Sequence, residues 1–231
     1  MKIKKLRFII IPVILLCVSV LAYSTAAYLK KFDFNDTKAL DKWAKMIFNG
    51  QVDYRLMKYG SEGFLRALSY KNCSAIYYRI GFNTASYPLI SWKWRALKFP
   101  DKSKVTTEKD RDDYVARIYV IFPFLNFSSS KFIEYVWDEK VPAGTIMDSP
   151  VSKNIKQIVV RSGPCGPDEW VSEERNIYED YIKVFGKKPG LSVGAIAIMC
   201  DADHTKSEAA SLFSEITIAN TSGIKKEVGR Q

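Results

Sequence analysis

Short segments in which apolar and polar residues alternate are the feature that most constrains the fold of this chain. The clearest of them, YVARIYVIF, places Ala116, Ile118 and Val120 on one face and Arg117 and Tyr119 on the other. Successive side chains of a β-strand point to opposite faces of its sheet, so this period of two predicts a strand.

Alternation recurs often enough to predict a mainly β fold. Further strand-like segments are residues 54–57, 64–69, 74–81, 87–97, 132–138, 156–162, 192–200 and 212–220. Residues 173–185 predict a short helix that ends at Gly186, and residues 36–48 predict either a second short helix or an edge loop. About nine strands with so few helices predict two packed antiparallel sheets, a β-sandwich or jelly roll.

The N-terminal segment predicts export. MKIKKLR carries four basic side chains and no acid, and Phe8 to Tyr28 follows as 21 residues without a charge. Such a segment is a signal peptide, with small residues at 24–26 for cleavage, or a hydrophobic helix that anchors the chain in the membrane. The basic flank predicts that the rest lies outside the cytoplasm, periplasmic or held at the inner membrane.

These segments predict three regions along the chain. Residues 1–31 form the signal peptide or anchor, residues 32–222 the sandwich domain, and residues 223–231 a flexible tail. Without the basic residues of MKIKKLR, 31 basic and 25 acidic residues remain, and no run of five like charges occurs. This spread favours a solvated basic surface, so no nucleic-acid partner is expected.

Cysteine spacing argues against a zinc site of the usual Cys/His kind. Cys73, Cys165 and Cys200 show no C-x-x-C pattern, and His204 is the single histidine. Two alternatives remain open, one disulfide with one free thiol and three isolated thiols.

The segment GAIAIMCDADHT, residues 194–205, ends in an Asp-x-Asp-x-Thr motif like that which opens the active site of haloacid-dehalogenase-type phosphatases. That fold continues with a parallel sheet carrying further magnesium ligands, which the 26 residues after Thr205 cannot supply. We therefore expect a polar turn here, or a structural calcium bound by Asp201, Asp203 and backbone carbonyls. No other cofactor is expected.

Five residues are candidates for ligand binding. Trp92 and Trp94 share a strand face, which forms a platform for sugar rings if exposed and core packing if buried; the alternation favours the core. Arg117 and Asp113 lie where a polar cluster meets a strand, and a buried Arg117 must pair with a carboxylate, with Asp113 or Asp180 expected. Trp170 could belong either to an exposed platform with these tryptophans or to the core.

An enzyme is the alternative, because glycoside hydrolysis needs two carboxylates flanking a cleft. The acidic candidates are Glu62, Glu134, Asp138, Glu173, Glu174 and Asp180, and the sequence ranks none of them. A Ser-His-Asp triad would have to use His204, and no G-x-S-x-G motif accompanies it.

The order of these segments resembles a bacterial envelope family known as domain of unknown function 3047 (DUF3047). The matching segments are FLRALSYKNCSAIYYRI, YPLISWKWRAL, KDRDDYVARIYVIF, EYVWD, IVVRSG, Trp170 with ERNIYEDYIKVFG, and VGAIAIMCDADHT before FSEITIAN. The resemblance implies a leader followed by a sandwich similar to galactose-binding and carbohydrate-binding modules. It implies no activity and no catalytic residues.

Together these observations predict an exported or envelope-anchored protein that binds a carbohydrate or another envelope ligand without catalysis. Trp92, Trp94, Asp113, Arg117 and Trp170 are the expected ligand-binding residues. The alternatives are a glycan-active enzyme with a carboxylate pair and a structural envelope protein with a protein partner.

Overall fold

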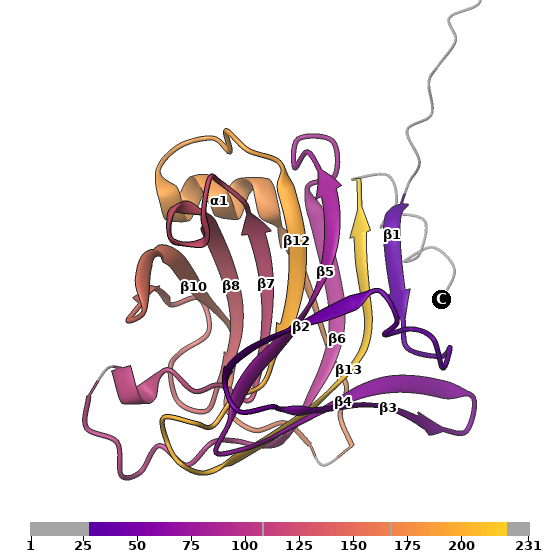
Figure 1. Ribbon diagram of the computed structural model, residues 1–231, viewed down its shortest axis with the longest axis vertical. Helices are drawn as coiled ribbons and strands as arrows, with labels where there is room; N and C mark the ends of the chain where they lie inside the picture. Colours follow the sequence, from indigo (N-terminus) through magenta and orange to yellow (C-terminus); the bar gives the residue numbers. More distant parts are fainter. Residues whose placement is uncertain (1–27, 108, 167, 221–231) are drawn as a thin grey trace, which may run out of the picture.

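The alternating segments pair into two β-sheets that pack face to face in the computed structural model (Figure 1). The structure describes residues 28–220 apart from residues 108 and 167. Residues 1–27 of the predicted leader and the predicted tail therefore lie outside the described residues. Residues 28–31, which the sequence assigned to the leader, belong instead to the first strand of the sandwich, β1 (Tyr28–Asp33), because they pair with β13 (Glu208–Ala219). Among the described residues, no helix has the length and apolar character needed to cross a bilayer.

The smaller sheet carries one wall of the core. Its strands run in the order β11 (Val171–Asn176), β6 (Leu89–Lys98), β13 (Glu208–Ala219), β4 (Glu62–Tyr70) and β3 (Asp53–Tyr59), and β1 (Tyr28–Asp33) also pairs with β13. All of these pairings are antiparallel.

The larger sheet carries the other wall. Its strands run in the order β2 (Trp43–Asn49), β5 (Cys73–Phe82), β12 (Val193–Met199), β7 (Ala116–Phe122), β8 (Lys131–Asp138), β10 (Ser152–Ser162) and β9 (Ile146–Ser149). The pairing of β8 with β10 is parallel, which the prediction of antiparallel sheets missed, and the other pairings of this sheet are antiparallel. Short 3-10 turns at Lys109–Arg111 and Phe127–Ser129 flank β7.

Aromatic side chains fill the space between the two sheets. Trp92 of β6 stacks on Tyr135 of β8, with ring centroids 5.3 Å apart, and Trp94 lies 5.5 Å from Trp137. These contacts join the sheets at the middle of the sandwich, so the alternation seen in the sequence marks the buried face of each strand.

The helix predictions were partly wrong. Residues 43–49 form the edge strand β2, because hydrogen bonding to β5 outweighs the local helical pattern. Residues 173–176 belong to β11, and the helix α1 (Ile177–Phe185) begins only after Asn176, whose side chain caps it by accepting the Glu179 N–H at 3.1 Å. Gly186, with a φ of 69°, ends the helix as predicted.

The described cysteines are free thiols. Cys73 and Cys200 are buried, and Cys165 is half-buried. Of the two alternatives left open by the sequence, the structure has the one without a disulfide.

Candidate functional site

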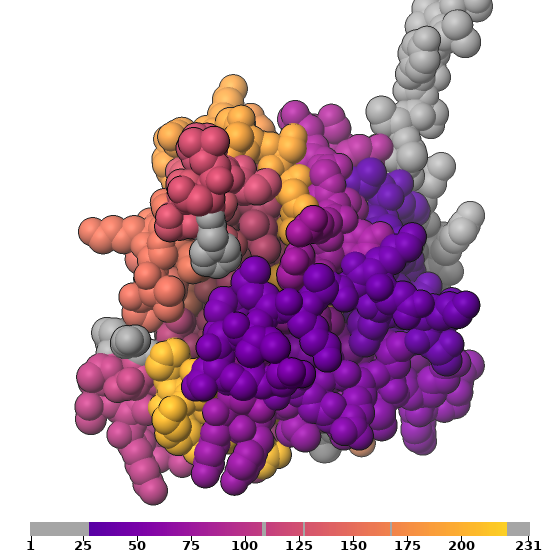
Figure 2. All heavy atoms as spheres, viewed as in Figure 1, coloured from indigo at the N-terminus to yellow at the C-terminus, as the bar shows by residue number. Residues whose placement is uncertain are grey.

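A cleft of about 760 Å³ lies over the outer face of the larger sheet, the face that points away from the smaller sheet. Side chains of β2, β5, β7, β8, β10 and β12 line it. In the space-filling view the indigo N-terminal segment that includes β2 lies beside the rose and salmon atoms of the β7–β10 region (Figure 2). The cleft thus draws on strands far apart in sequence.

Strand register builds the floor of this cleft. Tyr77 of β5, Ala197 of β12 and Tyr119 of β7 are direct cross-strand neighbours, and Glu134 of β8 continues the row beyond Tyr119. Adjacent strands lie about 4.8 Å apart, so the two tyrosine backbones stand about 10 Å apart with an alanine between them. The small side chain leaves a slot flanked by two aromatic ones.

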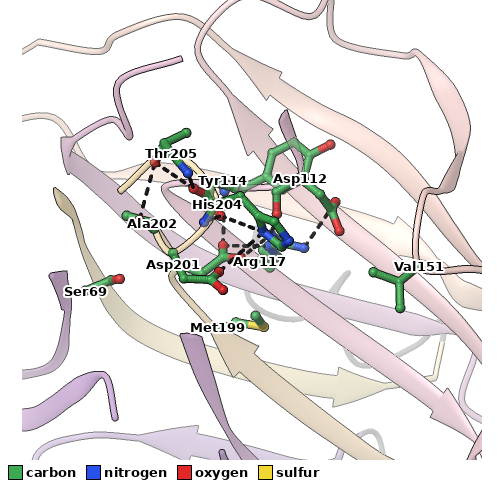
Figure 3. Close-up of polar contacts among 12 residues, drawn as sticks. Ser69, Asp112, Tyr114, Arg117, Val151, Met199, Asp201, Ala202, His204 and Thr205 are labelled. Carbon is green, nitrogen blue, oxygen red and sulfur yellow. Dashed lines mark hydrogen bonds and ion pairs between the residues drawn. The ribbon is translucent and has the colours of Figure 1, made fainter. Parts of the chain in front are cut away.

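One end of the cleft holds a buried charged cluster centred on Arg117 (Figure 3). Its guanidinium donates from Nε to Asp201 Oδ1 at 3.0 Å and from Nη2 to Asp201 Oδ2 at 2.5 Å. It also donates from Nη1 to Glu134 Oε1 at 2.6 Å, and from Nη2 to the backbone carbonyl of Asp112. Arg117 is therefore held on three sides.

Gln157 and Tyr119 complete the network around Glu134. The Gln157 amide donates to Glu134 Oε2 at 3.0 Å and to Asp112 Oδ1 at 2.7 Å, and the Tyr119 hydroxyl donates to Glu134 Oε1 at 3.0 Å. Both oxygens of Glu134 are thus engaged. Such a satisfied buried network fixes the positions of its polar groups.

The segment after β12 is tied to the start of β7 by Asp113, which is fully buried. Asp113 Oδ2 accepts the Thr205 N–H and hydroxyl, each at 2.6 Å. Asp113 Oδ1 lies 3.3 Å from both the backbone nitrogen and the ring Nδ1 of His204. The polar turn predicted for this segment is therefore present, and it is anchored by a residue that lies 91 positions before His204 in the chain.

Burial has the largest effect on the pKa values of the groups at the charged end of the cleft. It raises the pKa of the Glu134 and Asp201 carboxyls, and the nearby Arg117 opposes that rise. Burial lowers the pKa of Arg117, but Asp201 and the other acids outweigh it, so the pKa is raised and the guanidinium stays charged. Burial also raises the pKa of the Cys73 thiol on the cleft floor, which keeps it protonated.

A second cavity of about 660 Å³ adjoins the cleft and shares Asp112, Ser149 and Val151 with it. Basic side chains, including Lys102 and Lys140, lie on its wall. Lys102 Nζ pairs with Asp138 Oδ2 at 2.6 Å, so part of this charge is already offset within the protein.

The structure separates the five candidate residues predicted from the sequence. Arg117 and Asp113 lie at the charged end of the cleft. Trp92 and Trp94 are 1% and 0% exposed within the core, so neither indole can offer a face to a sugar ring. The hypothesis of an exposed tryptophan platform is therefore wrong for these two residues. They share one face of β6, and that face packs on β8 in the core. Trp170 is half-buried against Phe64 of the smaller sheet, away from the cleft.

The expected partners of Arg117 were also wrong. Asp180 pairs instead with Arg175, at 2.5 Å, and accepts the Tyr135 hydroxyl at 2.9 Å. Asp201 of the calcium hypothesis is the main partner of Arg117, and its two oxygens accept the guanidinium hydrogens. Asp201 has therefore little capacity left for a calcium ion, whereas Asp203 retains one oxygen without a hydrogen bond.

The acidic residues considered for glycoside hydrolysis are scattered. Of that set only Glu134 lines the cleft. Asp138 faces the second cavity, and Glu173 pairs with Arg161 Nε at 2.9 Å. Sequence reasoning placed Asp112 in the polar cluster before β7 but missed Tyr77 and Gln157 as parts of the site. For Tyr77, its alternation with buried Ile76 is the signal that could have placed it on an outer face.

Comparison with known proteins adds a family and a set of distant likenesses. The model of a family described as "Protein of unknown function (DUF3047)" matches residues 41–217. None of the curated proteins matches the chain.

Three solved structures illustrate the distant likenesses. The xyloglucanase domain of NopAA, a type three effector from Sinorhizobium fredii, is 12% identical with a TM-score of 0.45, covering 85% of this chain and 99% of that one. A family 29 carbohydrate-binding module is 8% identical with a TM-score of 0.38, covering 87% and 97%. A mannan-recognising carbohydrate-binding module is 10% identical with a TM-score of 0.35, covering 84% and 98%. At these TM-scores the likenesses carry no argument about the ligand of this chain.

Proposed function

Because the chain belongs to the DUF3047 family, whose description names no activity, we propose a function from the cleft itself. The protein binds a carbohydrate in the cleft over the larger sheet and does not cleave it. The observation that carries this proposal is the cross-strand row Tyr77–Ala197–Tyr119–Glu134, an aromatic slot that ends in a fixed polar group.

The two parts of the row match the two kinds of surface on a sugar ring. The C–H face of a pyranose is apolar and packs on aromatic side chains, as Tyr77 and Tyr119 offer beside Ala197. Hydroxyl groups at the ring edge donate hydrogen bonds, and the acid-rich end of the row, beside Glu134, supplies acceptors. Binding sites commonly combine an apolar lining with a few fixed polar groups in this way.

The arrangement of the acids favours binding over hydrolysis. A glycosidase needs one carboxyl free to donate a proton and a second free to attack or to activate water. Glu134 is held by Arg117, Tyr119 and Gln157, and Asp201 is held by Arg117. Either carboxylate would have to leave a satisfied buried network in order to react.

Binding is proposed to take place outside the cytoplasm, where the export signal predicted for residues 1–31 would deliver the domain. Alkaline phosphatase fused after residue 231 tests this location, because that enzyme is active only in an oxidising compartment. Activity that disappears when residues 2–27 are deleted, which leaves β1 intact, supports export. Equal activity of both fusions, or none from either, contradicts it.

The binding proposal is tested on the full chain, purified in mild detergent, with a panel of labelled bacterial and plant glycans. A glycan that binds is then titrated against Tyr77→Ala and against Tyr59→Ala. Tyr59 is the matched control because it is 84% exposed on β3 of the other sheet. Loss of one aromatic contact worth about 1.5 kcal/mol weakens Kd about tenfold, so we expect this loss in the Tyr77 variant alone.

Other outcomes of these experiments would contradict carbohydrate binding or favour one of its alternatives. Equal affinity of the Tyr77 and Tyr59 variants, or no glycan bound by a folded sample, would overturn the carbohydrate proposal. New reducing ends that vanish in Glu134→Gln would instead establish the glycan-active enzyme. Exposed Phe48, Phe124 and Val151 at the cleft rim favour a protein partner as the second candidate, which a glycan-negative result would bring forward.

A further inference from the structure

A single buried oxygen at the charged end of the cleft has no hydrogen-bond donor. Asp203 is 7% exposed, and its Oδ2 accepts the Asn49 side-chain amide at 3.1 Å. Its Oδ1 is buried and has no hydrogen-bond partner among the described residues. A buried carboxylate oxygen without a partner is costly and calls for a ligand or an ion.

Two further ligand atoms face that oxygen. His204 Nδ1 lies 3.4 Å from Asp203 Oδ1 and 3.3 Å from Asp113 Oδ1. A tetrahedral ion with bonds of about 2.1 Å keeps its ligand atoms about 3.4 Å apart. Both separations from His204 Nδ1 match that value, and one ligand atom from each of Asp113, Asp203 and His204 lies within 4.8 Å of the other two.

We propose that Asp113 Oδ1, Asp203 Oδ1 and His204 Nδ1 bind a divalent transition metal of the zinc class, with the fourth position open to the cleft. One imidazole with two carboxylates suits zinc, whereas calcium prefers six to eight oxygen ligands. This site uses Asp203 of the calcium hypothesis but replaces Asp201, whose oxygens are taken by Arg117.

The surroundings orient these ligands as a metal site requires. The Thr205 N–H and hydroxyl hold Asp113 Oδ2, and Asn49 holds Asp203 Oδ2, so each carboxylate turns its other oxygen toward His204. Such outer contacts fix ligand geometry in metal proteins. The ligands and these outer contacts together come from three separate parts of the chain, at residues 49, 113 and 203–205, so the fold brings the site together.

Charge and access agree with an ion at this position. Five buried acids lie at this end of the cleft, with Arg117 as the buried cation among them: Asp112, Asp113, Glu134, Asp201 and Asp203. A divalent ion offsets part of that excess. Asp203 and His204 line the cleft, and His204 is partly exposed, so an ion and its fourth ligand can enter from solvent.

The test uses the full chain with a histidine-free affinity tag, stripped of metal and titrated with Zn²⁺, Co²⁺ and Ca²⁺. We expect one Zn²⁺ per chain and a cobalt spectrum typical of a tetrahedral nitrogen and oxygen site. Loss of an outer contact alone weakens metal binding about 10- to 100-fold, so His204→Gln and Asp203→Asn should each weaken it more than about 100-fold. Asp168→Asn is the matched control, because Asp168 is exposed and pairs with Arg95.

A second measurement does not depend on the variants folding. His204 is the single histidine of the chain, so its imidazole NMR signals report on one site. Stoichiometric Zn²⁺ should shift them. Unchanged signals, unaltered Zn²⁺ affinity in folded His204→Gln, preference for Ca²⁺, or an intense sulfur–cobalt band from Cys73 would each overturn the proposal. It stands or falls independently of any glycan result.

Discussion

Replacing Arg117 with methionine tests whether the buried cluster acts as one electrostatic unit. The guanidinium contacts Asp201, Glu134 and the Asp112 carbonyl, and methionine keeps much of its length without the charge. Breaking a buried ion pair by removing one partner costs about 3–5 kcal/mol. Arg117 donates hydrogen bonds to the carboxylates of Asp201 and Glu134, and its Nη1 also lies 3.6 Å from Asp112 Oδ1, so the cost should exceed that of a single pair.

Proton uptake sets the upper limit of this cost. The two carboxyls have usual pKa values of 3.8 and 4.5, and each can become neutral once Arg117 is gone. At about 1.36 kcal/mol per pKa unit, protonating both at pH 7 costs about 8 kcal/mol. We therefore expect Arg117→Met to lower the free energy of unfolding by about 5–8 kcal/mol at pH 7, close to the whole stability of many domains.

The sign of the pH dependence follows from the same protons. Burial already raises the pKa of both carboxyls, so the stability they contribute is present at low pH and is lost as pH rises through their folded values. Removing Arg117 raises these pKa values further. The difference in unfolding free energy between the wild type and Arg117→Met should therefore shrink as pH falls. For two protons it shrinks by up to about 2.7 kcal/mol per pH unit.

Urea unfolding followed by tryptophan fluorescence at pH 5, 6 and 7 measures both effects. Arg55→Met is the control, because Arg55 pairs with Asp53 while 66% of its side chain is exposed. Such a surface pair contributes about 0–1 kcal/mol. Two results would refute the idea that the buried cluster acts as one electrostatic unit. One is an unfolding free energy that Arg117→Met lowers by less than about 2 kcal/mol at pH 7, and the other is an equal decrease at pH 5 and pH 7.

Three further expectations follow from single positions. Glu134→Gln should make the unfolding free energy fall less steeply as pH rises above about 4.5, because the raised pKa of Glu134 is one source of that fall; an unchanged slope in urea unfolding would contradict it. Trp94→Ala should destabilise the protein by about 3–5 kcal/mol, and half-buried Trp170→Ala by much less; similar melting temperatures for both variants would argue against the core position of Trp94. Gly63→Ala should cost about 1–3 kcal/mol or more, because a Cβ there would lie 2.3 Å from the Phe34 carbonyl oxygen; a variant that melts like wild type would exclude that close approach.

Strand content was predictable because local alternation survives in the tertiary structure. Residues 114–122 show this: Ile118 and Val120 face the core, and Arg117 and Tyr119 face the cleft, as the sequence pattern indicates. Edge strands were harder. In β2 only Trp43 is buried, so apolar periodicity is weak and pairing with β5 decides its conformation.

The site was only partly predictable, for a different reason. Sequence reasoning required a carboxylate for a buried Arg117 but expected Asp113 or Asp180, whereas Glu134 and Asp201 bind it. Glu134 and Asp201 are 17 and 84 positions away from it, and each reaches it only through the register of β7 with β8 and the turn after β12. No local pattern encodes such pairings.

The sequence by itself determined the mainly β content, the faces of the central strands and the end of α1 at Gly186, because these depend on residues close together in the chain. Tertiary structure decided which of those faces became core and which became cleft. It buried Trp92 and Trp94 and placed Tyr77, Tyr119 and Glu134 in one row. The physical reason is that sheet packing and strand register are long-range, so they set the surroundings of residues whose local patterns look alike.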